Sequence, residues 1–218
     1  MADFPFDCVG FDLDGTLVDS AGDIAASVNA AITAIGRAPL SVDDVRPLIG
    51  GGSRVLLERV LAASGDDAEL DRLLPILLDH YEAHMTDLTR PYDGVVGMLD
   101  LLRARGVTLA VVTNKREHFA VKLLRALGLL DRFACVIGGD SPGLAAPKPD
   151  PAPIALMIRR CAANQAAFVG DSIYDVRAAQ AAGIPVALFL PDGGDRLGAE
   201  AVFDRYDALP ATLESLTR

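Results

Sequence analysis

The stretch FDCVGFDLDGT, residues 6–16, decides the fold of this chain. Residues 6–13 are mostly apolar, aromatic or β-branched, and the turn-forming triplet DGT follows them at once. A short run of this kind that stops at a turn is typical of a buried strand. We therefore expect a strand here whose exit carries the carboxylates of Asp12 and Asp14.

After residue 90 the chain alternates between patterns typical of helices and of strands. Helical periodicity predicts helices at residues 95–105, 116–127, 153–162 and 174–182, and apolar runs predict strands at 107–113, 133–137, 166–170 and 185–190. This alternation predicts an α/β fold, a Rossmann-like, mainly parallel sheet with helices on both faces. The first strand of the chain belongs in the same sheet.

The segment between the first strand and residue 90 has a helical pattern throughout. Helices are expected at residues 23–36, 41–49, 55–63 and 68–88, and Pro75 marks a kink or a boundary in the last of them. We therefore expect an α/β core at residues 1–18 and 91–218, interrupted by an inserted all-helical cap domain at 19–90.

Size and charge exclude several classes of protein. At 218 residues a chain buries about 70% of its unfolded surface, so a stable core is expected and disorder is excluded. The formal net charge of −10 disfavours nucleic acid and anionic membranes as partners, because both are polyanions. A small anionic ligand would have to be held by local positive charge or by a metal.

The N-terminus and the cysteines indicate a cytoplasmic protein. Residues 1–36 contain no Lys or Arg, whereas a signal peptide needs a basic start, and apolar runs such as 73–78 are too short to span a membrane. Cys8, Cys135 and Cys161 are odd in number and form no C-x-x-C pair. We therefore expect buried, reduced thiols rather than disulfides or a zinc site.

Polar side chains follow the expected strands at the edge where an open α/β sheet binds ligands. The candidates are Asp12, Asp14, Thr113, Lys148, Asp171 and Asp175. Clustered carboxylates repel one another unless a cation lies among them, and ligands that are all oxygen suit Mg²⁺. The sequence therefore predicts a magnesium site that, together with Lys148 and backbone amides, binds a phosphate.

Four motifs carry a resemblance to a known family. They are DLDGTLVDS at 12–20, TNK at 113–115, KPDP at 148–151 and GDSIYD at 170–175. In order and spacing they resemble the four motifs of the haloacid dehalogenase-like phosphohydrolases, over essentially the whole chain. LIGGG at 48–52, LLER at 56–59 and CVIGGD at 135–140 resemble the phosphoglycolate phosphatase group in particular.

The resemblance implies a role for each catalytic candidate. Asp12 would be the nucleophile that attacks phosphorus and forms an aspartyl-phosphate, and Asp14 would protonate the leaving group and then deprotonate the hydrolytic water. Thr113 and the Asn114 backbone amide would bind phosphoryl oxygens. Lys148 would offset the negative charge of nucleophile and phosphate.

The resemblance also implies a set of ligands for the magnesium ion. Asp12, the Asp14 carbonyl and Asp171 would bind it directly. Asp175 would serve either as a further ligand or as an outer-shell group, and these two alternatives remain open.

Substrate-binding residues are expected in the first loop and in the cap. By resemblance, Gly15 and Thr16 would contact the substrate from the loop, and Gly51 and Gly52 from a cap segment that lies over the site. Arg54, at the end of that segment, would clamp a substrate carboxylate. The alternative is a surface arginine.

These features predict a cytoplasmic, Mg²⁺-dependent phosphoric monoester hydrolase for a small phosphorylated metabolite. The best guess is conversion of 2-phosphoglycolate to glycolate and phosphate. Alternatives in the same superfamily are a sugar-phosphate phosphatase, a phosphomutase and a pyrophosphatase, although Thr16 favours hydrolysis over mutase chemistry. An alternative from another functional class is a receiver-like phosphoacceptor signalling module, but the long helical insert disfavours it. The protein would be a monomer or a homodimer.

Overall fold

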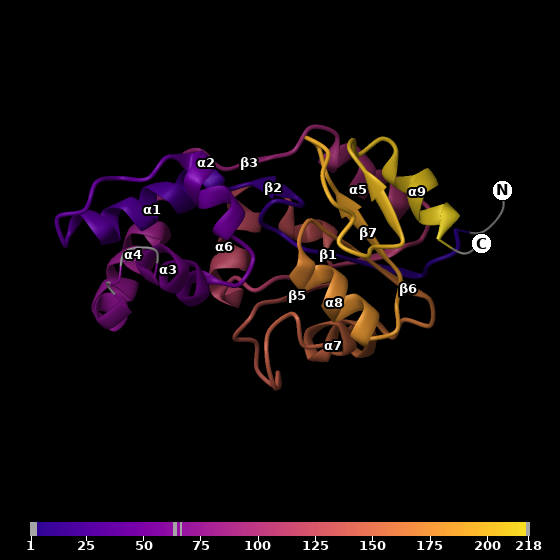
Figure 1. Ribbon diagram of the computed structural model, residues 1–218. Helices are drawn as coiled ribbons and strands as arrows, with labels where there is room; N and C mark the ends of the chain where they lie inside the picture. Colours follow the sequence, from indigo (N-terminus) through magenta and orange to yellow (C-terminus); the bar gives the residue numbers. More distant parts are fainter. Residues whose placement is uncertain (1–3, 63–64, 66, 217–218) are drawn as a thin grey trace. The chain divides into compact units, whose positions relative to one another are not determined.

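The computed structural model describes residues 4–62, 65 and 67–216. The chain forms two compact units, which we call the α/β unit (Met1–Leu17 with Pro91–Arg218) and the helical unit (Val18–Arg90). In Figure 1 the indigo-to-magenta helices α1 to α4 belong to the helical unit, and the α/β unit contains β1 and the chain after β3. Each unit is described on its own below.

A parallel sheet forms the centre of the α/β unit. Within the described residues its strands follow the order β5-β4-β1-β6-β7-β8, and every neighbouring pair is parallel. The strands are Cys8–Phe11 (β1), Thr108–Val112 (β4), Cys135–Ile137 (β5), Ala166–Gly170 (β6), Val186–Phe189 (β7) and Ala201–Phe203 (β8). Since β1 pairs with both β4 and β6, the carboxyl ends of these three strands are adjacent.

Helices cover both faces of this sheet. They are Val95–Ala104 (α5), Glu117–Ala126 (α6), Ala152–Cys161 (α7), Ile173–Ala181 (α8) and Leu209–Ser215 (α9), with a 3₁₀ turn at Leu130–Arg132. Figure 1 shows α7 and α8 on one face and α5 and α9 on the other. Every residue of β1, β6 and β7 is buried, as expected for parallel strands covered on both faces. The expected mainly parallel α/β fold is confirmed.

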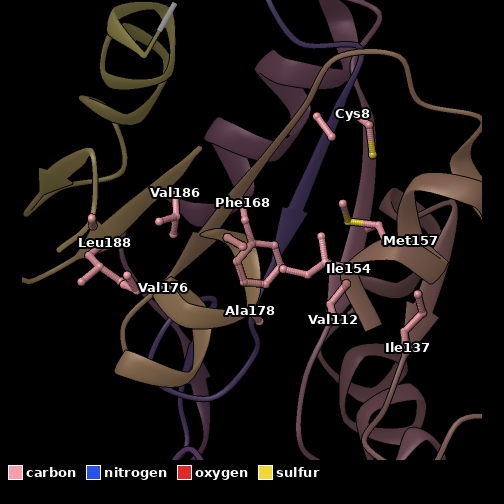
Figure 2. Packing of buried hydrophobic residues seen from close by; sticks show 14 residues of the cluster. Cys8, Val112, Ile137, Ile154, Met157, Phe168, Val176, Ala178, Val186 and Leu188 are labelled. Carbon is pink, nitrogen blue, oxygen red and sulfur yellow. The ribbon is translucent and has the colours of Figure 1, made fainter. Parts of the chain in front are cut away.

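One large apolar cluster joins the sheet to α7 and α8 (Figure 2). Met157 of α7 and Phe168 of β6 pack at its centre, directly over Gly10 of β1. A Cβ at Gly10 would lie 2.3 Å from the Met157 sulfur and 2.8 Å from a Phe168 ring carbon, so only glycine permits this approach. Each large side chain buried here contributes about 1.5–3 kcal/mol to the free energy of unfolding.

The helical unit consists of helices and short 3₁₀ turns. Its elements are Ala21–Thr33 (α1), Val42–Val45 (α2), Ser53–Ala62 (α3) and Leu70–His84 (α4), with 3₁₀ turns at Arg46–Leu48 and Asp67–Glu69. Helix α1 packs mainly against α4. The two-residue strands Val18–Asp19 (β2) and Arg90–Pro91 (β3) pair where the chain enters and leaves the unit. Among the described residues, no helix has both the length and the apolar character needed to cross a membrane.

Several expectations need correction. Of the two alternatives for Pro75, the helix boundary is wrong, because α4 runs through this residue and buries Leu73 and Leu77 on either side. The sequence pattern did not indicate β8 and α9, since β8 has only three residues and α9 only seven. Ala63, the expected end of the helix that is α3, lies outside the described residues.

Candidate active site

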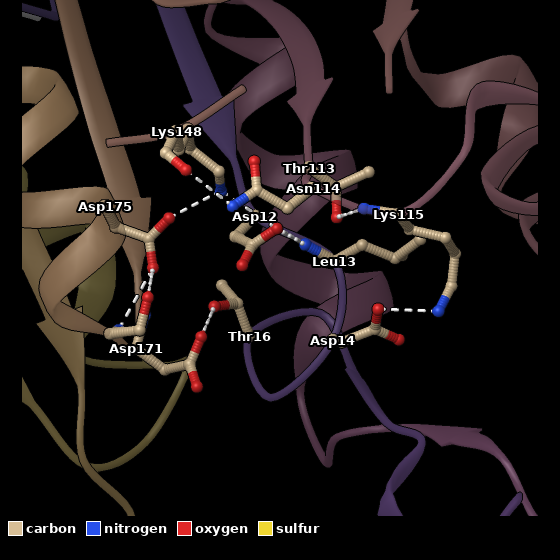
Figure 3. Close-up of polar contacts among 11 residues, drawn as sticks. Asp12, Leu13, Asp14, Thr16, Thr113, Asn114, Lys115, Lys148, Asp171 and Asp175 are labelled. Carbon is tan, nitrogen blue, oxygen red and sulfur yellow. Dashed lines mark hydrogen bonds and ion pairs between the residues drawn. The ribbon is translucent and has the colours of Figure 1, made fainter. Parts of the chain in front are cut away.

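Three neighbouring strands end in polar residues at one edge of the sheet (Figure 3). Asp12 follows β1, Thr113 follows β4 and Asp171 follows β6. The hydrogen bonds between the strands continue into the residues that follow them. The Asp12 amide donates to the Val169 carbonyl at 2.9 Å, and the Thr113 amide donates to the Ile137 carbonyl at 2.9 Å. The strand register therefore brings together side chains that are far apart in the sequence.

An acidic cluster lies at this edge. Asp12, Asp171 and Asp175 each offer a carboxylate oxygen, and the three oxygens lie within 4.8 Å of one another. Lys148 neutralises part of the cluster, with its Nζ 3.1 Å from Asp12 Oδ1 and 2.5 Å from Asp175 Oδ1. The Lys148 side chain is only 1% exposed. Two of the three carboxylates thus contact one buried ammonium.

The electrostatics of the cluster favour a bound cation. Burial raises the pKa of Asp12 to about 6, although the Lys148 ammonium opposes the rise. Burial, together with the charges of Asp175 and Asp12, raises the pKa of Asp171 well above its usual value. For Lys148 burial disfavours the charge, but the two carboxylates beside it outweigh this and raise its pKa. An oxygen-only donor set with excess negative charge fits a divalent cation such as Mg²⁺.

Asp175 is held firmly by the protein itself. Its Oδ1 accepts from Lys148, and its Oδ2 accepts from the Asp171 amide at 3.2 Å, the Ser172 amide at 3.0 Å and the Ser172 hydroxyl at 2.6 Å. Both oxygens of this fully buried side chain therefore already have protein partners. This arrangement fits the outer-shell alternative for Asp175 better than the ligand alternative.

The loop that follows β1 and contains Gly15 and Thr16 packs closely against Asp171. Gly15 adopts a φ of +79°, and a Cβ there would lie 2.3 Å from Asp171 Oδ2, so the loop requires glycine at this position. The Thr16 hydroxyl donates to Asp171 Oδ1 at 2.9 Å. The Thr16 carbonyl accepts a hydrogen bond from the buried hydroxyl of Tyr206. Tyr206 supports the loop from the C-terminal segment, where no sequence motif indicated it.

Asp14 has a partner that the sequence did not indicate. Lys115 Nζ lies 2.6 Å from Asp14 Oδ2, and the two side chains are 7% and 11% exposed. Figure 3 shows this pair on one side of Asp12 and the Lys148 and Asp175 pair on the other. Lys115 lies within the TNK motif, which is the signal that could have identified it.

The remaining predicted residues of the α/β unit link the loops after the strands. Thr113 is buried, and its hydroxyl accepts from the Lys115 amide at 3.3 Å. The Asn114 side-chain amide donates to the Lys148 carbonyl at 2.8 Å. The loop after β4 is thereby joined to the segment that carries Lys148.

Gly51, Gly52 and Arg54 belong to the helical unit. Gly52 has a φ of +85° immediately before α3. Arg54 Nε lies 3.3 Å from Glu58 Oε1, and Arg54 Nη2 lies 2.9 Å from Asp71 Oδ1, with the Arg54 side chain 54% exposed. Within its own unit Arg54 is therefore an exposed arginine with two carboxylate partners.

Comparisons with known proteins agree with the four motifs. The family model for haloacid dehalogenase-like hydrolases matches residues 9–189. A phosphoglycolate phosphatase of Agrobacterium fabrum is 43% identical over 180 residues, which is 80% of this chain and 76% of that protein. One of Cereibacter sphaeroides is 39% identical over 217 residues, covering 95% and 98% of the two chains. The crystal structure of a predicted phosphoglycolate phosphatase from Haemophilus somnus is 31% identical, with a TM-score of 0.84, and the match covers 94% of this chain and 96% of that one.

Proposed function

Because the chain belongs to the haloacid dehalogenase-like hydrolase family, we propose that it is a Mg²⁺-dependent phosphatase whose preferred substrate is 2-phosphoglycolate. The observation that carries the proposal is the cluster of three carboxylates in which Asp12 and Asp175 contact the buried ammonium of Lys148. This group combines a nucleophile, a cation site and a fixed positive charge. The names of the relatives at about 40% identity support the choice of substrate.

In this proposal Asp12 is the nucleophile. The Leu13 amide donates to Asp12 Oδ1 at 2.7 Å and Lys148 Nζ contacts the same oxygen at 3.1 Å, so the carboxylate has a fixed orientation. It attacks phosphorus in line and forms an aspartyl-phosphate. The positive charge of Lys148 reduces the repulsion between the carboxylate and the phosphoryl oxygens. The Thr113 hydroxyl and the Asn114 amide bind those oxygens.

Asp14 is the general acid and then the general base. It donates a proton to the leaving oxygen and takes one from the water that hydrolyses the aspartyl-phosphate. Lys115 holds the Asp14 carboxylate in one direction through the 2.6 Å contact between Nζ and Oδ2. Lys115 is therefore a positioning residue in this scheme.

The cation site uses the chain's own oxygens. Asp12, Asp171 and the Asp14 carbonyl would hold Mg²⁺, and Asp175 would act as an outer-shell group beside these ligands. A bound divalent cation supplies positive charge next to the phosphoryl oxygens. The Thr16 hydroxyl keeps Asp171 oriented through its 2.9 Å hydrogen bond.

The helical unit has the role of a cap in this proposal, with a cap at residues 19–90 and a core at 1–18 and 91–218. A cap excludes water from the reaction and adds contacts to the part of the substrate beyond the phosphate. Gly51 and Gly52 would allow close approach of the backbone, and Arg54 would bind the substrate carboxylate.

The test is phosphate release from a panel of substrates, measured as kcat/KM with Mg²⁺ and with excess EDTA. We expect kcat/KM for 2-phosphoglycolate to be higher than kcat/KM for hexose phosphates, pyrophosphate and p-nitrophenyl phosphate. Turnover in EDTA would contradict the metal requirement. A higher kcat/KM for a hexose phosphate would reject the substrate and leave the phosphatase assignment intact.

The nucleophile is tested separately with Asp12→Asn. This variant should lose all detectable hydrolysis while circular dichroism shows an unchanged fold. The exposed Asp192→Asn variant is the matched control and should retain full activity. Activity of Asp12→Asn close to that of the control would exclude Asp12 as nucleophile.

A further inference from the structure

The fold gathers three cysteines that are far apart in the sequence. Cys8 begins β1, Cys135 begins β5 and Cys161 ends α7. We call these residues the thiol cluster. They lie at the amino ends of the strands, and Cys8 precedes Asp12 by four residues, or about 13 Å of extended chain. The cluster is therefore separate from the acidic cluster at the opposite edge of the sheet.

Two of these thiols are in contact. The sulfurs of Cys135 and Cys161 are 3.8 Å apart, and all three cysteines are free. The expectation that all three thiols are buried is only partly correct. Cys8 is fully buried, whereas Cys135 and Cys161 are partly exposed. The contacting pair is therefore closer to solvent than Cys8.

The three thiols are not equivalent. Hydrogen bonding with the thiols of Cys135 and Cys8 lowers the pKa of Cys161. The same hydrogen bonds, together with burial, raise the pKa of Cys8 and of Cys135. The lowered pKa favours the thiolate of Cys161 over those of its neighbours, and the thiolate is the nucleophilic form of cysteine.

We propose that Cys135 and Cys161 form a peroxide-reactive pair that closes to a reversible disulfide. The Cys161 sulfur attacks one oxygen of hydrogen peroxide, the O–O bond breaks, and the products are a sulfenic acid on Cys161 and one water. The Cys135 sulfur then attacks the Cys161 sulfur, the S–O bond breaks, and a second water leaves. Overall two thiols lose two electrons and two protons, and the peroxide gains both.

The backbone positions of the pair suit this closure. A disulfide bond is about 2.05 Å long, so the sulfurs must approach by less than about 2 Å. Cys135 is the first residue of β5, which is the edge strand of the sheet. Cys161 is the last residue of α7, before Ala162 in the left-handed conformation. Both cysteines therefore lie at the ends of their elements, where small shifts disturb few hydrogen bonds.

Closure would also restrain the segment between the two cysteines. They are 26 residues apart, and the intervening chain includes Lys148. A disulfide stabilises a protein mainly by restricting the unfolded chain, so oxidation should raise Tm by on the order of 5 °C. Reduction with dithiothreitol should return Tm to its starting value.

The main test is peptide mapping of the full chain after treatment with hydrogen peroxide. Remaining thiols are blocked with iodoacetamide, and the protein is digested without reduction. We expect a linked peptide pair that contains Cys135 and Cys161, with Cys8 recovered as a blocked thiol after unfolding. A link between Cys8 and Cys161, or Cys161 recovered as sulfinic acid without any link, would overturn the proposal.

Single variants separate the two roles in the pair. Cys135→Ser should accumulate a sulfenic acid on Cys161 that dimedone labels, whereas Cys161→Ser should leave Cys135 unlabelled at the same peroxide concentration. Cys8→Ala is the matched control and should still form the link. The reverse pattern of labelling, or loss of the link in a folded Cys8→Ala variant, would contradict the assignment. None of these measurements depends on phosphatase activity.

Discussion

Lys148 and Arg54 each contact two carboxylates, but in opposite surroundings. Lys148 lies 3.1 Å from Asp12 and 2.5 Å from Asp175, with 1% of its side chain exposed. Arg54 lies 3.3 Å from Glu58 and 2.9 Å from Asp71, with 54% exposed. Water screens the exposed ion pairs and can solvate a carboxylate whose arginine has been removed. In the buried group no water replaces the ammonium of Lys148. Ion pairs of similar length are therefore expected to differ greatly in their effect on the free energy of unfolding.

The largest effect is expected for Lys148→Met. The variant leaves Asp12 and Asp175 without their ammonium in a buried site, so the free energy of unfolding should fall by about 3–5 kcal/mol. Phosphate release should fall to background as well. Urea unfolding measures the first effect and kcat/KM the second.

The control for this variant is Lys122→Met, which removes a lysine from the exposed face of α6. It should change stability by less than about 0.5 kcal/mol. A loss below 1 kcal/mol in Lys148→Met would show that the buried carboxylates lose their charge when the ammonium is absent.

A second effect concerns the metal and pH. Burial raises the pKa of Asp12 from 3.8 to about 6 in the folded chain, so the unfolded chain ionises first as pH rises. Without metal, this group's contribution to stability is complete below pH 3.8 and is lost as pH rises towards about 6. Magnesium binds the ionised site and should raise Tm by on the order of 5 °C at pH 7, with little effect at pH 4.

Differential scanning fluorimetry with and without Mg²⁺ at both pH values measures this effect. Asp12→Asn removes one carboxylate ligand and should reduce the magnesium shift at pH 7, whereas Asp192→Asn should leave that shift unchanged. Equal shifts at pH 4 and pH 7 in the unaltered protein would contradict a metal site built from ionised carboxylates.

The difference between buried and exposed groups also explains what the sequence could predict. Asp12 and Asp171 directly follow short apolar runs typical of buried strands, and the parallel sheet brings such strand ends together, so the acidic cluster was predictable. Tyr206 was not, because its hydrogen bond to the first loop depends on the path of a C-terminal segment with only short elements.

The thiol cluster shows a second limit. The spacing of the cysteines in the sequence did not indicate that any two would be neighbours, yet β5 and α7 bring the sulfurs of two of them to 3.8 Å. Lys115 lies inside a recognised motif, but its contact with Asp14 depends on the conformation of two loops. Periodicity predicts elements well, whereas contacts between loops depend on the tertiary structure.

A third, smaller effect is expected for Lys115→Met. If Lys115 positions Asp14, its loss should matter most when the leaving group needs a proton. We expect kcat/KM to fall roughly 100-fold for 2-phosphoglycolate and less than about 5-fold for p-nitrophenyl phosphate, whose leaving group departs without protonation. Lys115→Arg should recover part of the activity. Equal losses on both substrates would indicate a general role in folding or phosphate binding instead.

The smallest effect on stability is expected for Arg54→Ala, the exposed counterpart of Lys148. Its ion pairs with Glu58 and Asp71 are screened by solvent, so the free energy of unfolding, measured with urea, should change by less than about 0.5 kcal/mol. The informative measurement is KM. If Arg54 binds a substrate carboxylate, KM for 2-phosphoglycolate should rise about 10-fold while KM for p-nitrophenyl phosphate stays constant. The matched control, Arg72→Ala, removes another exposed arginine of the same unit and should change neither value. A uniform change across both substrates would reject the carboxylate contact and leave Arg54 as a surface residue.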